Sequence, residues 1–170
     1  MKDTIKFIGL FVVGLITAVF VYPIMHELGH LIVALLLDVK IIDINLFPLS
    51  YIICDFEGIG DLGVAAVGLG GALLPFIVSC VVKPNNFWLW YSNVLIQFIS
   101  LLSFLVSGIS AIVFIFTNST LTVTDDVVQM LNLSPKNQWF VMLFIVLLTA
   151  VATIKLMRSK LFTRVLQYYI

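Results

Sequence analysis

Two histidines with a glutamate beside the first could hold a metal ion and carry out acid–base chemistry. His26-Glu27-Leu28-Gly29-His30 has the HExxH pattern, and its two histidines are the only ones in the chain. Positions four apart on a helix lie on one face, so both imidazoles can reach one ion. Glu27 lies one residue further round, where its carboxylate can take a proton from a water molecule that the metal activates. The pattern predicts a zinc site with Glu27 as general base.

Such a site needs a third protein ligand, for which a carboxylate is suitable, and zinc then keeps its fourth position open to water or substrate. The acidic residues closest in sequence, Asp38 and Asp43, lie beyond the apolar part of the helix. Asp125 and Asp126 follow the third apolar stretch, whose end lies on the same membrane face as the second half of the first crossing. Topology therefore favours Asp125 or Asp126, and helix capping is the alternative role for this pair. The remaining candidates are Asp55, Glu57 and Asp61.

The setting of the motif strengthens its functional interpretation. An ionisable group inside a bilayer costs at least about 2.5–3.5 kcal/mol on insertion scales, so its presence there suggests a function. His26, Glu27 and His30 all lie within a long apolar stretch. The competing interpretation is that these side chains only form hydrogen bonds between helices.

The composition indicates a protein that is solvated by lipid. Of the 170 residues, 62% are hydrophobic and 11% are charged, and the mean hydropathy is +1.18. Soluble domains are about 45–50% apolar and about 25% charged. The formal net charge is zero, which gives no basic surface for nucleic acid. Cys54 and Cys80 have neither metal-binding nor redox spacing.

Four apolar stretches are each long enough to cross a bilayer once, which needs roughly 20 residues. The expected fold is a single domain over residues 1–170, an all-α membrane bundle of about four transmembrane helices. Residues 39–60 are rich in β-branched and aromatic residues and predict two short strands joined by a Pro-Leu-Ser turn. This hairpin-like element, between the first and second crossings, either offers an edge to an unwound substrate or is a short interfacial connector. The four stretches are 5–37, 62–82, 87–117 and 139–154.

The ends of the chain predict its membrane orientation. The first stretch has no small-residue cleavage site after it and is expected to be a retained helix, with a kink at Pro23. Residues 155–164 predict a basic amphipathic segment on the membrane surface. With four crossings, the side that holds both termini carries seven basic residues and the other side carries two. The positive-inside rule then places both termini in the cytoplasm.

HELGH within the membrane, a glycine-rich second crossing and a downstream aspartate resemble the site-2 protease family of intramembrane metalloproteases. The chain is most similar to the family's small bacterial branch, which lacks an inserted PDZ domain. Residues 68–75 resemble the small-residue second helix of that family, and residues 126–135 resemble the Asp-led helix before its last crossing. The resemblance implies a bacterial cell membrane and Asp126 as third zinc ligand. The chain departs from the larger members because it lacks their Asn-Pro-Asp-Gly type sequence at this ligand.

The predicted function is therefore hydrolysis of a peptide bond in a membrane protein or a membrane-associated peptide. Two other functions stay open: a catalytically inactive relative that acts as a membrane binding partner or chaperone, and a transporter whose histidines relay protons. Family members with one helix before HELGH usually have the site near the cytosolic face. The charge count places it nearer the opposite face.

Overall fold

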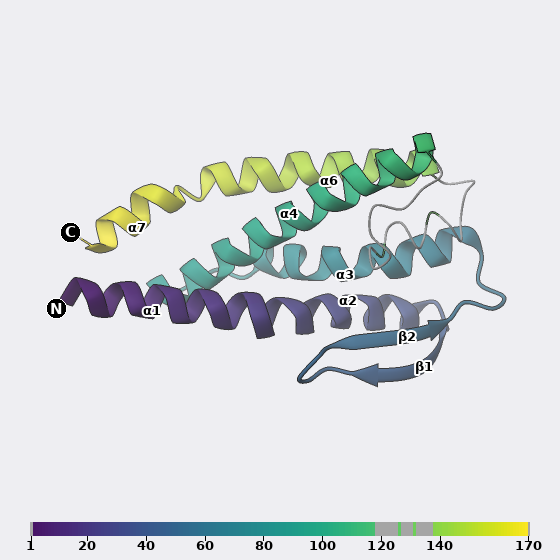
Figure 1. Ribbon diagram of the computed structural model, residues 1–170, viewed down its shortest axis with the longest axis horizontal. Coiled ribbons are helices and arrows are strands. Elements are labelled where there is room, and N and C mark those ends of the chain that lie inside the picture. Colours follow the sequence, from purple (N-terminus) through teal and green to yellow (C-terminus); the bar gives the residue numbers. More distant parts are fainter. Residues whose placement is uncertain (1, 118–125, 127–130, 132–137, 170) are drawn as a thin grey trace.

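The computed structural model describes residues 2–117, 126, 131 and 138–169. Its helices form an elongated bundle with both ends of the chain at one end, and a two-stranded sheet lies beside the first crossing (Figure 1). This confirms the expected fold class. The four helical segments that are long and apolar enough to cross a membrane are Thr4–Leu36, Asp61–Val81, Phe87–Thr117 and Gln138–Tyr168.

The first crossing consists of α1 (Lys2–Ile16), a π-helical turn η1 (Thr17–Val21) and α2 (Tyr22–Leu36). Pro23 has no N–H, and its ring crowds the carbonyl group four residues earlier, so an ordinary α-helix cannot continue through it unchanged. The wider π-helical turn lies immediately before Pro23 and accommodates this irregularity. The helix therefore continues into the HELGH segment.

The predicted strand pair is confirmed as β1 (Lys40–Asn45) and β2 (Tyr51–Asp55), which pair antiparallel. The hairpin folds back along the first crossing, because the rings of Phe20 and Phe47 stack with their centroids 6.0 Å apart. Phe20 lies 16 residues before the end of α2, which is about 24 Å along a helix. The exposed tip of the hairpin is apolar, with Phe47 64% and Leu49 79% exposed. Both the position and the polarity of the tip suit a hairpin that enters the bilayer.

α3 (Asp61–Val81) lies at the centre of the bundle and contacts both α2 and α4 (Phe87–Thr117). The backbones of α2 and α3 come closest at a glycine pair. A Cβ atom on Gly29 would overlap the carbonyl oxygen of Gly70, and one on Gly70 would lie 2.7 Å from the carbonyl oxygen of Gly29. Small residues permit this approach, as they do between other membrane helices. The approach places α3 directly against the HELGH motif.

The last crossing is longer than predicted. α6 (Gln138–Arg158) begins one residue before the expected start at 139 and extends one turn beyond residue 154. A turn with a positive φ of 53° at Lys160 separates it from α7 (Leu161–Tyr169). α6 packs on α4, whereas α7 bends back toward the N-terminus (Figure 1).

Candidate metal centre

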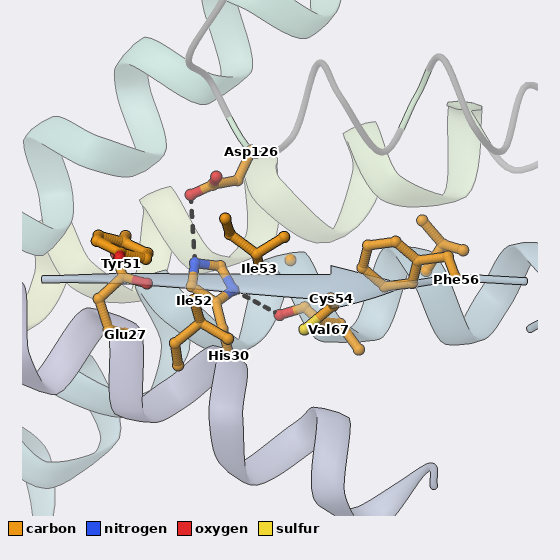
Figure 2. A pocket seen from close by; sticks show the side chains of 11 residues that line it. Glu27, His30, Tyr51, Ile52, Ile53, Cys54, Phe56, Val67 and Asp126 are labelled. Atoms are coloured by element: carbon orange, nitrogen blue, oxygen red, sulfur yellow. Dashed lines mark hydrogen bonds and ion pairs between the residues drawn. The ribbon is translucent and has the colours of Figure 1, made fainter. Parts of the chain in front are cut away.

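The structure brings His26, His30 and Asp126 together, although Asp126 follows His26 by 100 residues. The Nε2 atoms of the two histidines are 3.1 Å apart. The Oδ2 atom of Asp126 lies 3.0 Å from Nε2 of His26 and 3.3 Å from Nε2 of His30. Figure 2 shows Asp126 directed at His30 across the site. One nitrogen from each ring and one carboxylate oxygen therefore form a nearly regular triangle.

The size of this triangle fits a zinc ion. Donor atoms about 2.0–2.1 Å from a tetrahedral zinc lie about 3.3 Å apart. The three edges measured here are 3.0, 3.1 and 3.3 Å. The donor set of two imidazoles and one carboxylate is also one that zinc uses with an open fourth position. The residues present thus suit the predicted metal.

The hydrogen bonding of His30 supports the same fit. Its Nδ1 atom lies 2.8 Å from the carbonyl oxygen of Val67, and a carbonyl can only accept, so Nδ1 carries the proton. The Nε2 atom of neutral His30 then presents a lone pair to His26 and Asp126. A carboxylate is also an acceptor, so the electron pairs in the triangle repel one another unless a proton or a cation lies between them.

His26 differs from His30 in its outer hydrogen bond. Its Nδ1 atom is buried and has no hydrogen-bond partner among the described residues. A metal-bound histidine usually donates its second N–H to an outer partner, which fixes the ring. The orientation of His26 therefore depends on packing and on the atoms that face its Nε2.

Asp126 is held in its ionised form. Burial raises the pKa of its carboxyl group, but when the rings of His26 and His30 carry a proton on Nε2, their hydrogen bonds to Asp126 and their positive charges outweigh burial. The resulting pKa of Asp126 lies well below its usual range. An ionised carboxylate is the form that binds a metal ion.

Glu27 lines a cavity of about 360 Å³ together with His30 and Asp126. A carboxylate oxygen of Glu27 and one ring nitrogen from each of His26 and His30 lie within 4.8 Å of one another. This arrangement suits a group that exchanges protons with a molecule bound at the centre.

One wall of this cavity could not be identified from the sequence. β2 crosses the site and contributes Tyr51, Ile52, Ile53 and Cys54 to the lining (Figure 2). Burial raises the pKa of the Cys54 thiol, and the charge of Glu27 raises it further. The thiol stays protonated, which agrees with a structural rather than a reactive cysteine. The alternation of apolar residues predicted the strand, but it gave no sign that the strand folds back over the motif.

Gly71 also lies at the site, and the sequence did not reveal its position there. A Cβ atom there would overlap Nε2 of His30 and lie 2.8 Å from Nε2 of His26. Gly29 and Gly70 permit the close approach of α2 and α3. Gly71 instead leaves open the space beside the two donor nitrogens.

Gly71→Ala should therefore reduce zinc binding by about 10- to 100-fold, the loss typical of changes to groups that orient metal ligands. The added methyl group must displace one or both rings, and the donor triangle would be lost. Zinc per chain, measured over a range of free zinc concentrations, tests this. Gly14→Ala is the matched control, because its Cβ would meet its nearest neighbours, Leu95 and Tyr91, at an ordinary 3.6 Å. Equal zinc affinity in Gly71→Ala and wild type would contradict the assignment.

Two of the other acidic candidates have partners of their own, and a third lies outside the described residues. Asp43 accepts a hydrogen bond of 2.8 Å from the Tyr51 hydroxyl, and Asp55 pairs with Lys40 at 3.6 Å. Asp125 and its expected capping role fall outside the described residues, as does most of the Asp-led segment 126–135. Among the described carboxylates, Asp126 is thus the one that meets both histidines.

Comparison with protein-family models, with curated proteins and with solved structures finds no match for this chain.

Proposed function

We propose that this protein is an intramembrane zinc metalloprotease of the site-2 protease type, with His26, His30 and Asp126 as zinc ligands. The observation that carries the proposal is the triangle of donor atoms, with edges of 3.0 to 3.3 Å. Glu27 adjoins this triangle and faces a cavity, as a general base for hydrolysis must. A zinc ion bound there would polarise the scissile carbonyl group and lower the pKa of a water molecule.

Each residue then has a definite task. Glu27 takes a proton from the attacking water and passes it to the leaving nitrogen, so one carboxylate serves both transfers. The carbonyl oxygen of Val67 fixes the tautomer of His30 by accepting a hydrogen bond from its Nδ1–H. Gly71 keeps the space beside both rings clear. The surrounding helices limit the entry of water, which strengthens the electrostatic interactions at the site.

The proposed substrate is an extended segment of a membrane protein or a membrane-associated peptide. A helical segment must first unwind, because its backbone is shielded by its own hydrogen bonds. Within the described part of the chain, β2 pairs with β1 along one edge in a two-stranded sheet, and its residues line the cavity beside Glu27. The second edge of β2 could pair with the unwound segment by strand addition. That pairing would hold a peptide bond next to the cavity.

The test combines the zinc content of the purified chain with cleavage in membranes that contain it. Purified in detergent, the chain should hold one zinc ion that a chelator removes. Membranes that contain the wild-type chain should show new N-termini within membrane proteins that are absent from membranes with Glu27→Gln. Zinc without new N-termini would favour an inactive relative that binds membrane proteins. Absence of stoichiometric zinc would favour histidines that relay protons.

A further inference from the structure

A second cavity is lined by residues of the α3–α4 connection, α4 and α7, which meet at the end of the bundle where both ends of the chain lie (Figure 1). It has a volume of about 270 Å³ and is formed between the α3–α4 connection and α7. We call it the headgroup cavity. Its lining consists of Pro84, Asn85, Asn86, Phe87, Trp90 and Arg164.

α7 is held firmly over this cavity. The ring of Tyr168 stacks on Phe87 with centroids 3.9 Å apart and planes 5° apart. Lys6 on α1 donates a hydrogen bond of 2.9 Å to the carbonyl oxygen of Tyr168. The guanidinium group of Arg164 lies 5.1 Å from the centre of the Trp90 ring, within the range of a cation–π interaction. Arg164 is therefore placed at the wall of the cavity by contacts with α4.

The charge of Arg164 is not neutralised by the described part of the chain. No ion pair links it to a carboxylate among the residues that the structure describes. The segments at this end of the molecule, 2–6, 83–86 and 155–169, contain seven of the nine basic residues and one of the nine acidic residues of the chain. This end of the molecule thus favours an anion.

The apolar face of α7 indicates where that anion comes from. Phe162 is 83% exposed and Leu166 is 64% exposed, and residues four apart lie on one side of a helix. A helix with such a face and basic residues beside it lies in the membrane interface with its apolar side toward the acyl chains. Arg164 then lies at the level of the lipid headgroups, where phosphate groups are concentrated.

We propose that the headgroup cavity binds the phosphodiester group of an anionic glycerophospholipid. Arg164 supplies the positive charge and directed N–H donors that suit phosphate oxygens. Asn85 and Asn86 line the same cavity, and their amides carry further N–H donors, one of which Asn86 donates to Asn85. A zwitterionic lipid carries its own cation beside the phosphate, so a lipid with net negative charge satisfies Arg164 better. This proposal is independent of the chemistry at the metal centre.

The experiment is native mass spectrometry of the full chain, offered equal amounts of phosphatidylglycerol and phosphatidylcholine. Wild type should retain phosphatidylglycerol preferentially. Arg164→Gln should reduce that preference about fivefold, the contribution of one basic residue near an anionic bilayer surface. The matched control is Arg158→Gln, which removes the same charge from an exposed position outside the cavity and should keep the wild-type preference. Equal losses in the two variants would show diffuse attraction and overturn the cavity as the site.

Arg164→Gln also removes the contact between Arg164 and Trp90 and could loosen α7. A second variant therefore tests the cavity without touching α7. Asn85→Ala leaves the contacts of Arg164 and Tyr168 intact and should still lower the retention of phosphatidylglycerol; unchanged retention would overturn the proposal. Inorganic phosphate, added in excess to wild type with bound phosphatidylglycerol, separates the two sources of phosphate. Retention of the lipid supports a headgroup site. Displacement of the lipid by phosphate would identify a site for free phosphate and overturn the lipid assignment.

Discussion

Glu27→Gln should retain zinc at the wild-type level and lose cleavage by at least about 10²- to 10⁴-fold, the usual contribution of a positioned acid–base group. Glutamine preserves the size of the side chain beside the donor triangle, but its amide cannot accept the proton of the attacking water. The three atoms proposed as ligands belong to other residues, so metal binding does not depend on Glu27. The measurement pairs zinc per chain with the rate at which new N-termini form.

Glu57→Gln is the matched control for this experiment. Glu57 is exposed and is not among the residues that line the cavity, so the same chemical change there should leave both zinc and cleavage unaltered. Wild-type turnover in Glu27→Gln would remove the base role from this residue. Loss of zinc in Glu27→Gln would instead mean that its carboxylate belongs to the ligand set.

Asp126→Ala should lose both zinc and cleavage, because it removes one of the three converging donors. His26→Ala and His30→Ala should behave in the same way, and the three variants should remain folded and inserted in the membrane. The decisive comparison is with Asp125→Ala, which removes the neighbouring carboxylate and should keep zinc. Zinc per chain in each purified variant is the measurement.

Two outcomes would contradict the choice of Asp126. Loss of zinc in Asp125→Ala with retention in Asp126→Ala would move the ligand by one residue. Retention in both variants would move it to another carboxylate. Asp43 and Asp55 would then have to leave their present partners, Tyr51 and Lys40, which makes a rearranged hairpin the next structure to test.

The sequence predicted the parts of this site that depend on local geometry. The i, i+4 spacing of His26 and His30 required only that the segment be helical, and α2 continues through both positions. The helical crossings were predictable because each is a long apolar run. Asp126 was reached from the sequence through chain topology and a family resemblance, since no local pattern connects residues that lie 100 positions apart.

Other features depended on tertiary contacts that periodicity cannot encode. The two strands were predicted, but the return of the hairpin tip to Phe20 depends on packing against the first crossing. The glycine-rich run was predictable only as a segment that resembles a small-residue helix, and the rotation of α3 relative to α2 determines that Gly71 faces the imidazoles. A kink was expected at Pro23, and the structure has a π-helical turn in the residues before it, Thr17–Val21.

The packing of Trp88 against Gly9 indicates how deep in the bilayer the candidate metal centre lies. A Cβ atom on Gly9 would lie 2.8 Å from the Trp88 ring, so the two residues are level, and tryptophan marks the border of the hydrocarbon. At the average tilt of about 20°, a helix crosses the roughly 30 Å hydrocarbon layer in about 21 residues. Counted from Gly9, the opposite border falls at His30. We infer that the proposed zinc ligands lie at the far edge of the hydrocarbon layer, so water would need no deep channel to reach them and the proposed cleavage would fall near one end of the substrate's membrane segment.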